Sequence, residues 1–293
     1  MKPPVFHYVA PGSLDEAIQQ LGEYGDSAKL LAGGQSLVPL LNMRLAGPDV
    51  LIDVNGVGGL DHIEAWDGGL TIGALARQSA LERSHLAGDR LPLLAEAIHF
   101  VGHPTIRHRG TVGGSLAHAD PAAELPAVML ALEASLVARG PRGERTIPAA
   151  EFFQGYLTTA LAADEMLTEV LIPGVPPGTG SAFLELARRF GDFAICGAAA
   201  TITLDENGRC SRARVALCGV GPTPLRATET EALLEGALPD APTLAAAAER
   251  AALSVDPQTD IHGTAAYRRK MAIVMTGRAV ELAASRAQGG ARP

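Results

Sequence analysis

The sequence reads LAGGQS from residue 31 to residue 36, and a second run, from residue 110 to residue 115, reads GTVGGS. The first run leads from an expected strand into an expected helix over about 36–44, and the second leads towards an expected helix over about 121–132. Paired glycines let a ligand lie against bare backbone, and the N–H groups of such a turn, with a following helix N-terminus, suit a diphosphate. The serine after each pair adds a hydroxyl donor. Gly-Gly also marks ordinary tight turns, and that alternative stays open for each run.

The motifs that are missing narrow the choice of ligand. The sequence contains no G-x-x-x-x-G-K-[ST] loop of an ATPase and no G-x-G-x-x-G between a strand and a helix. It also lacks a G-x-S-x-G nucleophile elbow and an H-E-x-x-H zinc motif. The remaining candidate is a flavin diphosphate held between two loops outside a Rossmann fold.

Outward from these runs, the chain divides into three parts of mixed α and β structure. In residues 1–57, Ser13 and Glu16 form a capping box for a helix that ends near Tyr24. Residues 58–175 repeat the mixture on a larger scale. Strands are expected over 29–32, 50–54, 70–74, 135–138 and 166–172, and further helices over 93–99 and 121–132.

A linker rich in glycine and proline, over residues 173–180, separates these parts from the last one, residues 178–288. The last part begins with two β-rich runs joined by an Asn-Gly turn at 207–208, which favours a hairpin. Ala-rich helices follow. The β-rich runs are expected over 193–204 and 212–220, and the helices over 228–235, 243–253 and 265–285.

Composition excludes several classes of protein. Of the 293 residues, 47% are hydrophobic and 19% are charged, so a sizeable core can form, and a net charge of −8 disfavours nucleic-acid binding. The start of the chain lacks the apolar run of a signal peptide, and no stretch of about 20 apolar residues follows. We therefore expect a cytoplasmic protein without a transmembrane segment.

No metal site is expected from the cysteines and histidines. The three cysteines have no C-x-x-C spacing, so by themselves they build neither a zinc site nor an iron–sulfur cluster, and they are expected to be buried free thiols. The histidines are scattered over helix and loops without ligand spacing. The residues concerned are Cys196, Cys210, Cys218, His99, His103, His108 and His118.

At the two glycine-rich runs and at three further motifs, the chain resembles the FAD-binding medium subunit of the carbon monoxide dehydrogenase family of molybdenum hydroxylases. The flavin domain of xanthine dehydrogenase is a more distant relative. Five motifs agree in order and spacing over essentially the whole chain: 32–36, 106–110, 111–115, 118–126 and 188–194. The resemblance implies a two-subdomain FAD-binding domain of the PCMH type, 1–57 and 58–175, followed by a C-terminal domain of antiparallel sheet plus helices over 178–288.

The resemblance also implies partners and a route for electrons. The expected partners are a small subunit with two [2Fe–2S] clusters and a large subunit with a molybdenum–pterin site, assembled as a dimer of heterotrimers. Electrons would pass from molybdenum through the clusters to FAD and then to an external acceptor. The hard chemistry would belong to the flavin, so no residue is needed as a general acid or base.

Site residues follow from the resemblance position by position. Both loops are expected to hold the FAD diphosphate through backbone N–H groups and hydroxyls. Glu124 matches an acidic residue near the sugar or ribityl hydroxyls, and Phe193 matches a tyrosine against the isoalloxazine ring. The expected FAD contacts are Leu30, Leu31, Ala32, Gly33, Gly34, Gln35, Ser36, Leu37, Val101, Thr111, Val112, Gly113, Gly114, Ser115, Asp120, Glu124, Leu167 and Phe193.

The chain departs from the family pattern at two positions. Phe193 keeps the aromatic face but lacks a hydroxyl. The family often has a lysine in the strand before Arg188, whereas residues 184–187 supply none, so either a positive charge near the flavin is absent or Arg188 replaces it. For Asp120, contact with a partner subunit is the alternative to contact with FAD.

Two other functions stay open at the level of sequence. One is a free-standing FAD-dependent oxidoreductase that binds its own substrate, and the other is a scaffold that keeps the fold without the cofactor. The organic substrate of a complex is not determined by this chain, because that selectivity would lie in the molybdenum subunit. The final electron acceptor is equally undetermined.

Overall fold

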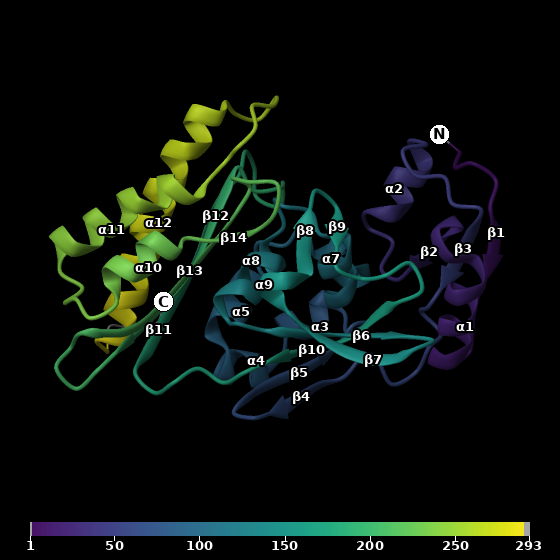
Figure 1. The fold of residues 1–293 in the computed structure, drawn as a ribbon, viewed down its shortest axis with the longest axis horizontal. Coiled ribbons are helices and arrows are strands. Elements are labelled where there is room, and N and C mark those ends of the chain that lie inside the picture. Colours follow the sequence, from purple (N-terminus) through teal and green to yellow (C-terminus); the bar gives the residue numbers. More distant parts are fainter. Residues whose placement is uncertain (1, 290–293) are drawn as a thin grey trace.

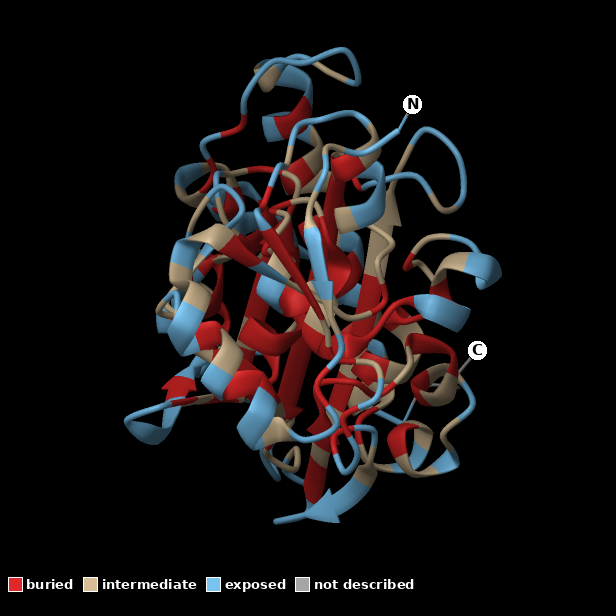
Figure 2. Ribbon diagram, turned by 90° about the vertical axis from the view of Figure 1, so that its right-hand side faces the viewer, coloured by how far each residue is buried: buried red, intermediate tan, exposed pale blue. Residues whose placement is uncertain are grey.

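Three separate β-sheets, each with its own helices, organise residues 2–289 in a computed structural model of the protein (Figure 1). The sheets follow one another along the chain and along the length of the molecule. The first lies at the purple end of Figure 1, and the third lies at the green and yellow end. Buried residues follow the strands and the inner helix faces, while the loops at the periphery are exposed (Figure 2).

The first sheet is parallel and has the strand order β1-β3-β2. Its first helix is positioned as expected, because the Ser13 side chain accepts a hydrogen bond from the Glu16 amide. The Glu16 carboxylate instead accepts from the Gly12 amide, one residue earlier than a regular capping box requires. The elements are β1 (His7–Val9), α1 (Leu14–Tyr24), η1 (Gly25–Ser27), β2 (Ala28–Leu31), α2 (Leu37–Asn42) and β3 (Val50–Asp53).

The second sheet is antiparallel, in the order β4-β5-β10-β6-β7, and helices cover it. Its strands are β4 (Ile63–Trp66), β5 (Gly69–Gly73), β6 (Ser135–Gly140), β7 (Gly143–Pro148) and β10 (Met166–Ile172). A small hairpin is formed by β8 (Phe153–Gly155) and β9 (Thr158–Thr159). The helices are α3 (Gln78–Glu82), α4 (His85–Arg90), α5 (Pro92–Ala97), α6 (Pro104–Arg109), α7 (Val112–His118), α8 (Glu124–Ala131) and α9 (Ala149–Phe152).

The third sheet is antiparallel, in the order β11-β12-β13-β14. One face packs on the long C-terminal helix α12, and the other packs on α8 of the preceding part. Successive residues of its long strands therefore alternate between two hydrophobic cores, one shared with the second part of the chain and one beneath α12. The elements are β11 (Thr179–Leu186), β12 (Cys196–Leu204), β13 (Cys210–Cys218), β14 (Leu225–Arg226), α10 (Thr228–Leu234), α11 (Ala241–Ser254) and α12 (Ala265–Ala287).

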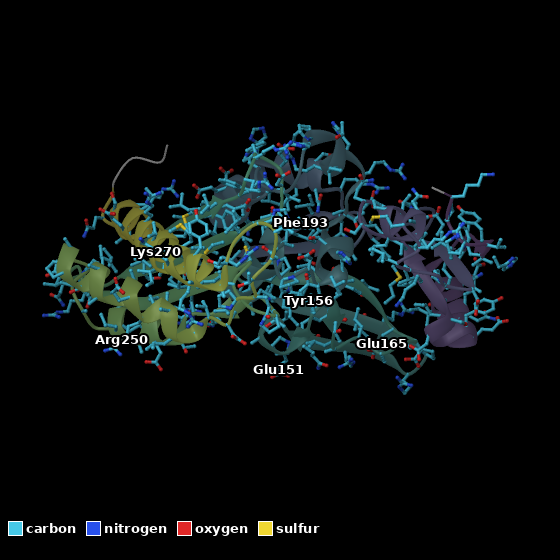
Figure 3. All side chains as sticks on the ribbon, turned by 90° about the horizontal axis from the view of Figure 1, so that it is seen from above. Glu151, Tyr156, Glu165, Phe193, Arg250 and Lys270 are labelled. Atoms are coloured by element: carbon cyan, nitrogen blue, oxygen red, sulfur yellow. The ribbon has the colours of Figure 1, made fainter. Side chains whose placement is uncertain are left out.

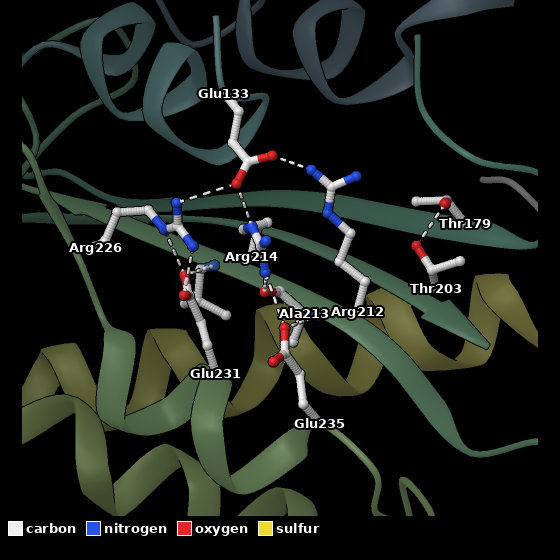
Figure 4. A network of polar contacts seen from close by, with 10 residues as sticks. Glu133, Thr179, Thr203, Arg212, Ala213, Arg214, Arg226, Glu231 and Glu235 are labelled. Atoms are coloured by element: carbon white, nitrogen blue, oxygen red, sulfur yellow. Dashed lines mark hydrogen bonds and ion pairs between the residues drawn. The ribbon is translucent and has the colours of Figure 1, made fainter. Parts of the chain in front are cut away.

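A network of ion pairs joins the third sheet to the second part (Figure 4). Glu133, which follows α8, lies within ion-pair distance of Arg212, Arg214 and Arg226. Arg214 also pairs with Glu235 at 2.8 Å. One carboxylate from the second part thus meets three guanidinium groups of the third sheet.

Several boundaries differ from the sequence-based expectation. The expected helix over 121–132 begins only at Glu124, because the Asp120 side chain and carbonyl accept from the amides of Ala122 and Ala123 and form a turn. The linker ends earlier than expected, since Thr179 and Gly180 already belong to β11. The helix after the first glycine run is shorter than 36–44. The short helices α3, α4, α6 and α7 were not expected.

All three cysteines are buried free thiols, as expected. Among the described residues, 2–289, no helix is both long enough and apolar enough to cross a membrane.

Candidate functional site

The two glycine-rich loops, residues 31–36 and 110–115, touch each other although they are far apart in sequence. A Cβ added to Gly33 would lie 2.5 Å from the Arg109 carbonyl oxygen and 2.7 Å from the Gly110 Cα. A Cβ added to Gly114 would lie 3.8 Å from the Ala32 Cβ. Glycine at position 33 therefore allows backbone to approach backbone, and the two loops border one common site.

The first loop offers unused backbone donors. It follows the carboxyl end of the parallel strand β2, where open α/β sheets commonly bind ligands, and Gly34 adopts a positive φ of 73°. Within the part of the chain that the structure describes, the amides of residues 33–36 have no hydrogen-bond acceptor. The Ser36 hydroxyl makes no capping bond. This turn suits an anionic ligand such as a diphosphate.

The second loop corrects one part of the sequence-based expectation. It is the first turn of α7 rather than an open turn before a later helix. Its amides already have acceptors: Val112 donates to the Ala76 carbonyl and Gly113 to the Ala74 carbonyl, each at 2.9 Å, while Gly114 and Ser115 donate to Thr111. The amides of residues 112–115 are therefore not free, and the side-chain donors that remain there are the hydroxyls of Thr111 and Ser115.

Asn55 and Arg77 hold the two loops together, and sequence reasoning missed both. The Asn55 amide group donates to the Ala32 carbonyl at 2.8 Å and to the Leu31 carbonyl at 3.3 Å. Arg77 donates to the Asn55 side-chain oxygen at 2.7 Å and also to the Arg109 carbonyl. Asn55 follows β3, the neighbour of β2, so its place after a parallel strand was the signal available in the sequence.

Arg107, from the motif before the second loop, also has a structural role. Its guanidinium is buried, pairs with Glu82 through two hydrogen bonds of 2.8 and 2.9 Å, and donates to the carbonyls of Val101 and Gly102. Arg107 lowers the pKa of Glu82 below its ordinary value. This pair fixes α6, which leads directly into the second loop.

The apolar candidates occupy two environments. Val101 and Leu167 are buried in the core of the second part, whereas Leu30, Leu31 and Leu37 beside the first loop are partly buried. Phe193 is 62% exposed in the loop between β11 and β12. Figure 3 shows it near the middle of the molecule's length. An exposed aromatic ring at this place is available to a ligand or a partner protein.

The loop that carries Phe193 lies against the second part of the chain. A Cβ added to Gly191 would come within 2.5 Å of the His103 imidazole. The motif at residues 188–194 is thereby brought next to residues 102–103, just before α6. The third part of the chain therefore contacts the second part at the start of α6, the helix that leads into the second loop.

Carboxyl groups mark the start of α8. Glu124 is only 4% exposed, and burial raises its pKa to about 7, with a further contribution from the negative charge of Asp120. Burial likewise lowers the pKa of His118, although Asp120 acts in the opposite direction. A buried carboxyl with this pKa can accept hydrogen bonds from hydroxyl groups when it is ionised and donate one when it is protonated.

Comparison with known proteins agrees with this architecture. Residues 4–175 match the FAD binding domain in molybdopterin dehydrogenase, and residues 181–283 match the CO dehydrogenase flavoprotein C-terminal domain. The 6-hydroxypseudooxynicotine dehydrogenase complex subunit alpha of Paenarthrobacter nicotinovorans is 46% identical over 288 residues, which cover 98% of this chain and 97% of the relative.

Carbon monoxide dehydrogenase provides a second relative and a solved structure. The medium chain of the enzyme from Hydrogenophaga pseudoflava is 40% identical over 286 residues, covering 98% of this chain and 99% of the relative. A structure of carbon monoxide dehydrogenase from the same organism, lacking the Mo-pyranopterin moiety, superposes with a TM-score of 0.95 at 42% identity. That match covers 98% of this chain and 99% of the other. The chain belongs to the FAD-binding medium subunits of the carbon monoxide dehydrogenase type of molybdenum hydroxylases.

Proposed function

We propose that this chain is the electron-transfer subunit of a heterotrimeric molybdenum hydroxylase. A small partner subunit with two [2Fe–2S] clusters would deliver electrons, a large molybdopterin subunit would oxidise the substrate, and two heterotrimers would form the assembly. The observation that supports the proposal is that the two loops touch at Gly33, so that donors from both loops can reach one ligand. FAD supplies the electron-accepting and electron-releasing chemistry when bound.

Different residues around this site bind different parts of FAD. The amides of residues 33–36 and the hydroxyls of Ser36 and Ser115 bind the diphosphate, for which free N–H and O–H donors are required. Glu124 and Asp120 accept hydrogen bonds from sugar or ribityl hydroxyls. Apolar side chains flank the flavin and the first loop: Leu30, Leu31, Leu37, Val101, Leu167 and Phe193.

Substrate selection belongs to another subunit in this proposal. Two relatives that resemble this chain over nearly their full length are named for 6-hydroxypseudooxynicotine and for carbon monoxide. Substrates so different in size do not share one pocket. A common medium subunit beside different molybdenum subunits accounts for both.

The three-part organisation is also a proposal. Residues 1–57 and 58–175 form the two FAD-binding subdomains, and residues 178–288 form the C-terminal domain. The support is that each division contains its own sheet, and that the first loop belongs to one subdomain and the second loop to the other.

The visible spectrum of the purified full-length chain tests the proposal. We expect a flavin absorption that stays with the protein through gel filtration, or that returns when FAD is added to the stripped protein. Absence of tight FAD binding in both cases would contradict it. Steady oxidation of a small organic molecule by the chain alone would instead support a free-standing oxidoreductase.

A further inference from the structure

A second carboxyl group, that of Glu185, lies at the boundary between the FAD-binding and C-terminal domains, and the charge of Glu124 acts on it. Glu185 lies in β11, two residues after Phe183, so both side chains point to the same face of the sheet. That face packs on the FAD-binding domain, because Phe183 contacts Phe100 with ring centroids 5.3 Å apart. Glu185 is opposite Gly197, which is opposite Cys218. Its carboxyl thus enters an apolar interface.

No positive group compensates this carboxyl in the described residues. The Glu185 Oε2 atom is buried and has no hydrogen-bond partner there. Arg188 follows the end of the strand and is exposed. Arg268 of α12 donates to the carbonyls of Ile195 and Gly219 and pairs with Asp260 at 2.7 Å.

The other titratable groups around the pair add negative charge or none. Asp120, before α8, adds a third carboxyl near Glu124. Glu96 of α5 is paired with Arg286 at 2.8 Å. Cys196 of β12 and Cys218 of β13 are thiols whose pKa values are raised by burial, so they are neutral. Two unpaired carboxylates in such an interface would repel each other and lack solvation.

We propose that Glu185 and Glu124 together hold a proton inside the closed interface, and that release of this proton loosens the contact between the two domains and the FAD bound beside it. The effect on FAD rests on the proposed function, in which Glu124 contacts the cofactor.

The direction of the pH dependence follows from burial. Burial, together with the Glu124 charge, raises the pKa of Glu185 to about 9, and burial raises that of Glu124 to about 7. The ordinary value of both is 4.5. At pH values between the ordinary pKa and the raised pKa, the folded chain therefore binds more protons than the unfolded chain. The free energy of unfolding falls as pH rises through this range, and above the raised pKa these two groups lower it no further.

The experiment compares the full-length chain with Glu185→Gln, which has nearly the same shape and cannot ionise. We expect the unfolding equilibrium constant of the unmodified chain to rise, relative to the variant, by about tenfold per pH unit between about pH 7 and pH 9. The dissociation constant for FAD should rise with pH over the same range in the unmodified chain and change less in the variant. Glu144→Gln, an exposed carboxyl in β7, is the matched control and should follow the unmodified chain.

Infrared spectroscopy of the cofactor-free chain provides a readout that needs neither FAD binding nor activity. At neutral pH the carbonyl-stretching band of a protonated carboxyl should be present, should disappear on titration to alkaline pH, and should be weakened in Glu185→Gln. Absence of the band at neutral pH overturns the proposal, even if the variant does not fold. Parallel stability profiles of the unmodified chain and Glu185→Gln overturn it too. A chain that shows the band but fails to bind FAD would refute the proposed function and leave the shared proton supported.

Discussion

Gly33 is the residue at which the two glycine-rich loops touch, and it has no room for a side chain. We predict that Gly33→Ala lowers FAD occupancy strongly and destabilises the chain by about 1–3 kcal/mol, because the new methyl group would press on the Arg109 carbonyl and the Gly110 Cα. The flavin-to-protein absorbance ratio and urea unfolding measure the two effects. Gly58→Ala is the control, since its Cβ would meet nothing within 4 Å. Full FAD occupancy in Gly33→Ala would show that the loops need not meet in this way.

Arg77 is the second residue that decides the geometry of the loops. Arg77→Met keeps the aliphatic volume but removes the hydrogen bonds to Asn55 and to the Arg109 carbonyl. Loss of such charged hydrogen bonds costs about 1.5–3 kcal/mol. We therefore expect the dissociation constant for FAD to increase roughly tenfold to hundredfold, as measured by fluorescence titration. The exposed Arg83 provides the control Arg83→Met, and equal affinities in the two variants would contradict this role of Arg77.

At the scale of elements, α8 connects the proposed FAD site to the third sheet. Its first residue is Glu124 at the site, and Glu133, just beyond its end, is the carboxylate that three arginines of the C-terminal domain share (Figure 4). The C-terminal domain is thus in contact with the residue that follows the end of α8. The orientation of the two domains is therefore set by a few polar contacts as well as by apolar packing.

We predict that Glu133→Gln lowers the free energy of unfolding by roughly 1–2 kcal/mol, because three guanidinium groups lose their shared counter-charge. Solvent weakens these ion pairs, since the Glu133 side chain is 33% exposed. Urea titration measures the change. Asp164→Asn removes the partner of Arg142, which is 73% exposed, and should have almost no effect. Equal losses in the two variants would mean that the network is no stronger than a surface ion pair.

At the scale of the whole molecule, the chain binds the redox cofactor but is proposed to need partners for substrate oxidation. We predict that a chemical reductant bleaches the flavin absorption of the isolated chain, whereas organic substrates do not. In the complete complex, substrate should bleach it, and Gly33→Ala in the complex should abolish that reduction while the iron–sulfur signals still respond. Stopped-flow absorbance follows both centres. Flavin reduction by substrate in the isolated chain would contradict the proposal that substrate oxidation needs the partner subunits.

Much of the fold could be predicted from the sequence because its signals are local. The capped helix α1, the apolar strand β10 and the hairpin of β12 and β13 were all expected near their observed positions. The helix α7 was missed because its first turn contains paired glycines, which have low helix propensity. Its formation depends on a Thr111 cap and on the carbonyls of Ala74 and Ala76, which lie in the segment after β5.

Sequence by itself determined the three-part α+β order, the two glycine-rich loops and the membership of a flavin-binding family, since these rest on residue types at fixed spacing. Only the tertiary structure decided that the amides of the first loop are free while those of the second are used, and that Arg77 joins the two loops. It also decided that Glu185 faces an interface rather than solvent. The physical reason is that a donor, an acceptor or a charge acquires its role from its neighbours. These neighbours lie 22 and 32 residues away in sequence for the two Arg77 contacts, and for Glu185 the charged neighbour, Glu124, lies in helix α8 of the preceding part.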